Sequence, residues 1–129
     1  MEVITREATE STPKILFDHQ TGDLRLSGRS IPENATRFYY PLLDWLNEYA
    51  QKPADQTKFE FYLEYINSIS QKMVLEILNI AQRMRQESQN ITIVWRYDED
   101  DDEMLEEAQV FAQKFELDIQ IIPVPEDEQ

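Results

Sequence analysis

Residues 58–67, KFEFYLEYIN, decide the fold of this 129-residue chain because they alternate between two kinds of side chain. The apolar and aromatic positions, which share one side of an extended strand, are Phe59, Phe61, Leu63 and Tyr65. The acidic positions on the opposite side are Glu60 and Glu64. A parallel strand that is covered on both faces has a continuous apolar run instead. The alternation therefore predicts a sheet with one covered face and one face at least partly open to solvent or to a partner.

The neighbouring segments alternate between strand and helix periodicity. Residues 14–19 and 23–28 flank the turn residues Thr21 and Gly22, which predicts an antiparallel hairpin. A helix follows with its cap at Ser30, as part of a Ser30-x-x-Glu33 capping box, or at Asn34. The further predicted helices cover Ser70 to about Ser88 and Met104–Phe115, and the further strands cover Ile91–Tyr97 and Asp118–Val124.

This order of elements predicts the topology. Strand–helix–strand crossovers are right-handed, so successive crossovers in one direction place their helices on one face of the sheet. We expect an α/β fold with a single mixed sheet, in which an N-terminal hairpin is antiparallel and the remaining strands are parallel. The main helices should lie chiefly on one face. We also expect a flexible tail over residues 1–11, one domain over residues 12–125 and a frayed end over residues 126–129.

The charge of the chain restricts its partners. Acidic residues outnumber basic ones 26 to 12, which gives a formal net charge of −14. Such a surface repels phosphate backbones and anionic lipids, so we expect neither nucleic acid nor membrane as a partner. A protein with a basic patch fits better. The polar first residues, MEVITREATEST, have no apolar signal-peptide core, and we expect a cytoplasmic protein.

Few residues are suited to catalysis. The chain has no cysteine, one histidine and two glycines, which leaves no thiol nucleophile and no glycine-rich phosphate loop. The acidic run Asp98-Glu-Asp-Asp-Asp-Glu103 could bind a divalent metal, or it could be a solvated helix N-terminus favoured by the helix dipole. We expect no enzymatic activity and no cofactor, with a metal-dependent hydrolase using residues 98–103 as an alternative.

The junction Asn67-Ser68-Ile69-Ser70 places two hydroxyl groups where a strand gives way to a helix. Ser68 and Ser70 are both suited to capping the helix. A phosphoryl group at this position would add about −1.5 to −2 charges beside free backbone N–H groups, which favour an anion. The junction is therefore either a helix cap or a site of reversible phosphorylation.

Four stretches together resemble the SiaC family of bacterial biofilm-regulating phosphoproteins. They are GRSIPENA at 28–35, PLLDWLNEY at 41–49, YINSIS at 65–70 and VWRYDEDDDEMLEEAQVFA at 94–112. The resemblance implies a fold like the STAS domain of anti-sigma-factor antagonists. It also implies phosphorylation by a cognate Ser/Thr protein kinase, dephosphorylation by a PPM-type phosphatase and binding of a diguanylate cyclase by the unphosphorylated form. Ser68 matches the phosphorylated position of the family.

We therefore interpret the chain as a non-enzymatic partner-switching phosphoprotein, with Ser68 as its modified residue. The residues expected to contact the partner are Asn67, Ser70, Lys72, Glu33 and Asn34. Besides the metal-dependent hydrolase, a STAS-like module that binds a small molecule in an apolar pocket is a further alternative.

Overall fold

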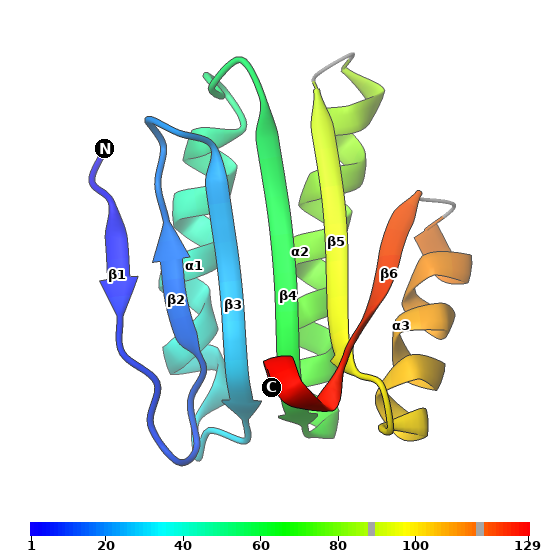
Figure 1. The fold of residues 1–129 in the computed structure, drawn as a ribbon. Coiled ribbons are helices and arrows are strands. Elements are labelled where there is room, and N and C mark those ends of the chain that lie inside the picture. The colour runs from blue at the N-terminus through cyan, green and yellow to red at the C-terminus, as the bar shows by residue number, and fades with distance from the viewer. Residues whose placement is uncertain (88–89, 116–117) are drawn as a thin grey trace.

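The computed structural model describes residues 1–87, 90–115 and 118–129 (Figure 1). The strands are β1 (Ile4–Arg6), β2 (Lys14–Phe17), β3 (Asp23–Ser30), β4 (Thr57–Ile66), β5 (Ile91–Asp98) and β6 (Ile119–Val124). The helices are α1 (Ala35–Tyr49), α2 (Ser68–Gln86) and α3 (Asp102–Phe115), followed by a 3-10 helix at Glu126–Glu128. None of the helices described is long and apolar enough to cross a membrane. The expected end of α2, near Ser88, lies outside the described residues.

All of these strands form one sheet in the order β1-β2-β3-β4-β5-β6. Strands β1, β2 and β3 pair antiparallel, whereas the pairs β3–β4, β4–β5 and β5–β6 are parallel. The three long helices lie on the same side of the sheet (Figure 1). The single mixed sheet with its helices on one face, predicted from the sequence, is confirmed.

The alternation in β4 produces this one-sided arrangement. Phe59, Phe61 and Leu63 are at most 1% exposed beneath the helices. Phe61 stacks on Trp95 of β5 with ring centroids 4.9 Å apart. Such a pair adds about 0.5–1.5 kcal/mol to the stability that burial alone provides. The covered face is therefore an aromatic and aliphatic core.

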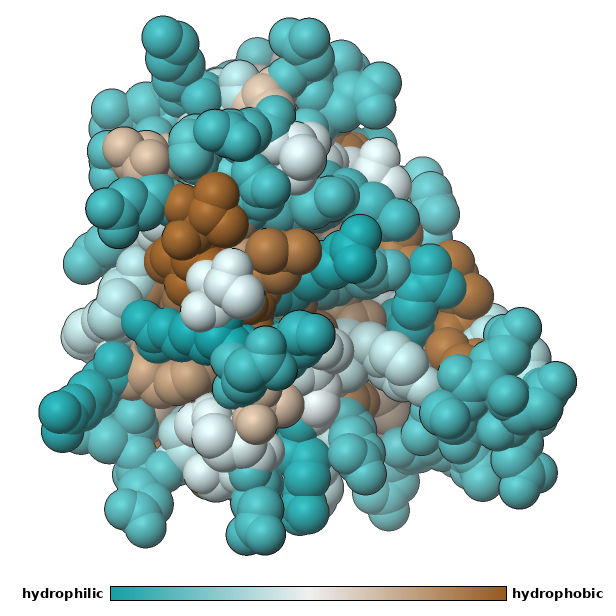
Figure 2. Space-filling view, turned by 60° about the vertical axis from the view of Figure 1, so that its left-hand side comes forward, coloured by the Kyte–Doolittle hydropathy of each residue, from teal (hydrophilic) through white to brown (hydrophobic). Residues whose placement is uncertain are grey.

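The opposite face of the sheet carries charges. Glu60 of β4 lies between two arginines, with Arg96 Nε 2.7 Å from Oε1 and Arg25 Nε 3.3 Å from Oε2. Burial opposes the ionisation of Glu60, but the hydrogen bond from Arg96 and the nearby positive charges outweigh it and hold its pKa below the usual value. Figure 2, turned so that the β1 edge of the sheet comes forward, shows a largely hydrophilic surface in which hydrophobic side chains gather in patches.

Both ends of the chain carry secondary structure. Ile4–Arg6 form the edge strand β1, which pairs with Ile15–Phe17. The Trp45 indole N–H also donates to the Glu2 carbonyl at 2.6 Å. At the other end, residues 126–128 form the 3-10 helix. Strand β1 has three residues, which are too few to show a strand pattern in the sequence.

The C-terminal end of β4 departs from strict alternation. Gly28 pairs with Leu63 and Arg29 with Tyr65, so Glu64 has no partner on β3 and forms a bulge. After the bulge the orientation of the side chains is reversed. Tyr65 is 53% exposed and Ile66 is 7% exposed. The prediction that Tyr65 faces the core was therefore wrong.

Helices α1 and α3 start at positions that side-chain caps explain. Asn34 is the cap of α1, because its Oδ1 accepts from the Arg37 amide at 3.1 Å. Ser30, the other expected cap, is instead the buried last residue of β3. Helix α3 begins at Asp102, and the Asp101 carboxylate accepts from the Met104 amide at 3.1 Å. Both helices thus start at the edge of the sheet formed by the C-terminal ends of β3 and β5.

Candidate functional site

The link between β4 and α2 is fixed by Asn67. Its side-chain Oδ1 accepts from the Ser70 amide at 2.9 Å, which makes Asn67 the cap of α2. Its own backbone N–H donates to the Ser30 carbonyl at 3.1 Å. The start of α2 is therefore attached both to its own first turn and to the end of β3. The expectation that Ser68 or Ser70 caps the helix was wrong, since Asn67 competes for the same role.

Ser68 is the first residue of α2, and its side chain is exposed. Within the part of the chain that the structure describes, no hydrogen bond is made by its hydroxyl group. Because Asn67 provides the cap, the Ser68 hydroxyl is not needed to start the helix. It is therefore available to an enzyme that approaches from solvent.

Ser70 points the other way and is fully buried. The Ser30 hydroxyl donates to Ser70 Oγ at 2.8 Å and lies 2.5 Å from the Tyr39 hydroxyl. Since Ser30 has a single hydroxyl proton, Tyr39 is the donor to Ser30. Burial raises the pKa of Tyr39 above its ordinary value. Ser70 thus joins α2 to β3 and α1, and its expected direct contact with a partner does not fit its burial.

The first turn of α2 is the positive end of a helix in an otherwise acidic protein. It contains no acidic residue, in contrast to the first turn of α3, which holds Asp102 and Glu103. The exposed Lys72 lies four residues after Ser68, a spacing at which two side chains on a helix are neighbours. Free backbone N–H groups, the helix dipole and Lys72 all favour an anion beside Ser68.

Glu33 and Asn34 lie at the start of α1, and both are exposed. The structure brings Asn67, Ser68, Ser70 and Lys72 together at the start of α2. In the residues described, no hydrogen bond or ion pair connects Glu33 or Asn34 to that turn. They share an edge of the sheet with it because α1 and α2 both begin there (Figure 1).

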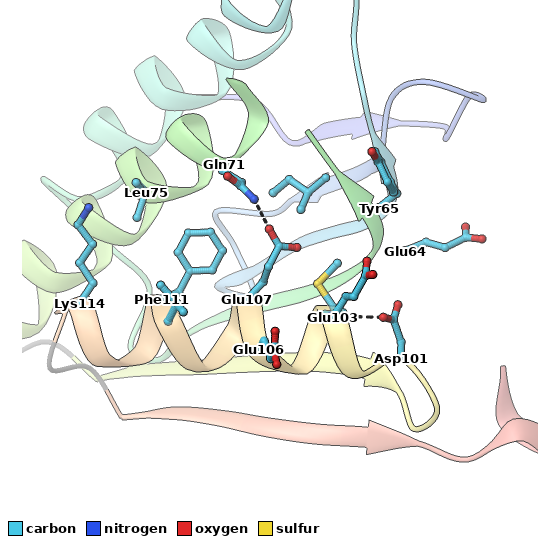
Figure 3. Close-up of a pocket in the computed structure, with 13 residues that line it drawn as sticks. Glu64, Tyr65, Gln71, Leu75, Asp101, Glu103, Glu106, Glu107, Phe111 and Lys114 are labelled. Atoms are coloured by element: carbon cyan, nitrogen blue, oxygen red, sulfur yellow. Dashed lines mark hydrogen bonds between the residues drawn. The ribbon is translucent and has the colours of Figure 1, made fainter. Parts of the chain in front are cut away.

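A groove of about 590 Å³ lies between α2, α3 and the end of β4 (Figure 3). Its apolar and aromatic lining consists of Tyr65, Ile66, Leu75, Met104, Val110 and Phe111. Its polar and charged lining consists of Glu64, Gln71, Asp101, Glu103, Glu106, Glu107 and Lys114. The groove thus combines an apolar floor with a strongly acidic rim.

The strand pairing explains why the groove forms at this place. The paired residues of β4 and β5 extend from Thr57–Ile91 to Phe61–Trp95, whereas β4 stays paired with β3 as far as Ile66. The end of β4 is therefore separated from β5, and the bulge at Glu64 turns Tyr65 toward the opening. On the open face, the Tyr62 hydroxyl donates to Asp98 Oδ1 at 2.5 Å across the two strands. Burial and this contact with Asp98 raise the pKa of Tyr62 to about 12.

One hydrogen bond spans the groove. The Gln71 side-chain amide of α2 donates to Glu107 Oε1 of α3 (Figure 3). Burial raises the pKa of Glu107 above the usual value, and the charges of Asp101 and Glu103 raise it further, while the bond from Gln71 opposes the shift. The carboxylates of the rim therefore lie close enough together to repel one another.

The sequence interpretation did not identify this groove. Val110 gave a signal, because it is apolar yet falls outside the buried stripe of α3. It is 60% exposed in the structure. Tyr65 gave no signal, because only the bulge moves it out of the alternating pattern.

The acidic run at residues 98–103 is divided among separate interactions. Asp98 accepts from Tyr62, Asp101 caps α3, and Glu99 Oε1 lies 3.4 Å from the Glu126 amide. Over residues 1–87, 90–115 and 118–129, no group of three or more acidic or histidine side chains is placed to hold a metal ion together. The arrangement gives no support to the metal-dependent hydrolase.

Comparison with protein families gives one match over most of the chain. A family model described as SiaC family regulatory phosphoprotein matches residues 6–124. An uncharacterised protein of Pseudomonas aeruginosa (strain UCBPP-PA14) is 29% identical over 105 residues, which cover 81% of this chain and 83% of that protein.

Solved structures are similar over nearly the whole fold. The crystal structure of apo-SiaC from Pseudomonas aeruginosa matches with a TM-score of 0.83 and 25% identity, covering 95% of this chain and 99% of that one. A crystal structure of the diguanylate cyclase SiaD in complex with its activator SiaC, from the same organism, matches with a TM-score of 0.88 and 26% identity. That match covers 94% of this chain and 99% of the other.

Proposed function

The chain belongs to the SiaC family of regulatory phosphoproteins, and we propose that it is a partner-switching protein whose phosphorylated residue is Ser68. In this proposal a cognate Ser/Thr protein kinase modifies Ser68 and a PPM-type phosphatase restores it. The unmodified form binds and activates a diguanylate cyclase. The protein acts through that enzyme and has no catalytic activity of its own.

The observation that carries the proposal is the contrast between the two serines of one helical turn. Ser68 is exposed and its hydroxyl makes no hydrogen bond among the residues described, whereas Ser70 is buried and hydrogen-bonded to Ser30. A kinase must bring the hydroxyl into its active site, and only Ser68 offers this without unfolding α2. Because Asn67 caps the helix, modification of Ser68 also leaves the cap in place.

The electrostatics favour a stable phosphorylated form. A phosphoryl group on Ser68 would lie beside free N–H groups of the first turn and one helical turn from Lys72. Such an environment favours a dianion, so the fold is retained after modification. The same positive end of α2 is suited to an acidic group of the partner. A phosphoryl group would occupy that position, repel the acidic group and reduce binding.

The sharpest test compares two added charges at two helix starts. Ser68→Asp places a carboxylate at the start of α2, and Thr36→Asp places one at the exposed start of α1. We expect both variants to keep the wild-type melting temperature within a few degrees, because a helix N-terminus favours an acid. Ser68→Asp should weaken cyclase binding at least about tenfold, which corresponds to about 1.4 kcal/mol. Thr36→Asp should leave binding unchanged in the same titration.

Kinase labelling provides the second measurement. Ser68→Ala should take up no phosphate from the cognate kinase and should melt like the wild type, since its hydroxyl makes no hydrogen bond within the described residues. Phosphate on another residue of the wild type, together with normal cyclase binding by Ser68→Asp, would show that the proposal is wrong.

A further inference from the structure

The proposed phosphorylation of Ser68 does not account for the groove between α2 and α3. Its floor is formed by Ile66, Met104 and Phe111, which are buried. Tyr65 and Val110, which are 53% and 60% exposed, stand at its opening. Large apolar side chains that are exposed beside a concave apolar floor are characteristic of a surface that another molecule covers.

The charges of the rim select the occupant. Five carboxylates line the groove, from Glu64, Asp101, Glu103, Glu106 and Glu107, against the single cation of Lys114. The raised pKa of Glu107 reflects burial first and then repulsion by Asp101 and Glu103. A partner that brings cations to this rim relieves the repulsion, whereas an acidic or neutral partner does not.

We propose that this groove binds an amphipathic helix of the partner protein, with an apolar face against Tyr65 and Val110 and Lys or Arg side chains along the α3 rim. Rows of apolar side chains at helical spacing fit a groove between two helices, which is a recurring mode of peptide recognition. The identification of the groove as part of the partner surface rests on the proposed function. Its apolar and acidic lining is independent of Ser68.

The groove is also aligned with Ser68. Gln71 and Leu75, which line the α2 side, lie three and seven residues after Ser68 and therefore on the same face of the helix. A bound helix that follows the groove ends near the first turn of α2. The surface is positive at the start of α2 and negative along the acidic rim. This difference in charge sets the direction of the bound segment.

The test uses a synthetic amphipathic peptide of about 14 residues, with Leu at i, i+3, i+4 and i+7 and Lys on the flanks. It is titrated into the full chain labelled with ¹⁵N. We expect shift changes concentrated at Tyr65, Gln71, Leu75 and Val110. The same peptide with Glu in place of Lys, or Ser in place of Leu, should bind at least about tenfold more weakly. The first change removes the attraction to the acidic rim, and the second removes the apolar contact with the groove. Shift changes spread over the whole acidic surface would overturn the proposal.

Two matched pairs of variants separate groove binding from general attraction to an acidic protein. Val110→Ser is paired with Tyr40→Ser, which removes another exposed hydrophobic side chain, on α1. Glu106→Lys is paired with Glu48→Lys, which makes the same change in net charge away from the groove. The groove variants should weaken peptide binding about fivefold or more, and the α1 variants less than about twofold. Equal effects within each pair would overturn the proposal.

The groove proposal and the proposed function can be tested independently. Phosphate incorporation at Ser68 is measured on the same four variants, and all should be labelled like the wild type. Cyclase binding that responds to Ser68→Asp but not to Val110→Ser or Glu106→Lys would overturn the groove proposal alone. Cyclase binding that responds to the groove variants and ignores Ser68→Asp supports the groove and rejects the phosphorylation switch.

Discussion

The two faces of the sheet are stabilised by different interactions. The covered face is packed with aromatic and aliphatic side chains, such as Phe61 stacked on Trp95 and Trp95 on Phe111. The open face is held by Glu60 between Arg25 and Arg96 and by the bond from Tyr62 to Asp98. Apolar contacts have no charge to titrate or screen, whereas partly exposed ion pairs depend on both pH and salt. The covered face therefore sets the stability of the fold, and the open face adjusts it.

Neighbouring residues of β4 provide the strongest test of this comparison. Phe61→Ala removes a fully buried ring and should lower the free energy of unfolding by about 3–5 kcal/mol. Tyr62→Ala, on the open face, removes a half-buried ring with its bond to Asp98 and should cost about half as much or less. Urea denaturation of both variants gives the two values. Equal losses would contradict the division between the faces.

A polar cluster within the covered side is the chain of hydroxyls from Tyr39 through Ser30 to Ser70. Ser70→Ala leaves the buried Ser30 donor without its acceptor and should cost about 1–3 kcal/mol. Ser68→Ala, two residues earlier but exposed, should change stability by less than about 0.5 kcal/mol. Thermal and urea unfolding of the two single variants measures the difference. A silent Ser70→Ala would show that the hydroxyl chain does not fix the start of α2.

On the open face, Glu60→Gln should lower stability at pH 7 by about 1 kcal/mol, because it removes the charge that Arg25 and Arg96 share. The folded pKa of Glu60 is depressed, so its contribution is present above the unfolded pKa of roughly 4.3. It is lost as the pH falls through the lower folded value. The variant and the wild type should therefore become equally stable in acid. A difference in urea midpoint that persists at low pH would contradict the ionic origin.

The smallest effect is expected at the groove, and it has the opposite sign. Burial and the neighbouring Asp101 and Glu103 raise the pKa of Glu107. The favourable contribution of its protonated form is present at low pH and is lost as the pH rises through the folded pKa. Glu107→Gln removes the charge and should stabilise the protein at pH 7 by about 0.5 kcal/mol or less, since solvent screens this position. The gain should disappear in acid; a gain independent of pH would mean that repulsion at the rim is not its cause.

The fold could be predicted because its signals are local. The alternation around Phe59 and Glu60 indicated one open face, and the order of elements indicated parallel crossovers on one side. Strand β1 was missed because Ile4–Arg6 has too few residues to form a pattern. The outward turn of Tyr65 depends on the register with Arg29 of β3, which is far away in sequence.

The strand-to-helix junction that carries the candidate site was predicted, but its detail was not. Asn, Ser and Thr all favour helix caps, so propensity alone does not rank Asn67 above Ser68. The burial of Ser70 depends on Ser30 and Tyr39, which come from a different strand and helix. The groove depends on the separation of β4 from β5 beyond Phe61 and on the packing of α2 against α3. Such features arise from tertiary structure, and no local pattern in the sequence encodes them.

The order of strands in the sheet follows the order of strands in the chain, from β1 at one edge to β6 at the other. During synthesis each strand therefore emerges after the neighbour with which it pairs, and no later strand has to be inserted between two that are already joined. Strands that follow one another in the chain are also closer in sequence than non-consecutive partners would be, which lowers the entropic cost of pairing. The sheet can thus grow at a single edge on the ribosome. The acidic rim on α3 and the strand β6 are therefore synthesised after the turn that carries Ser68.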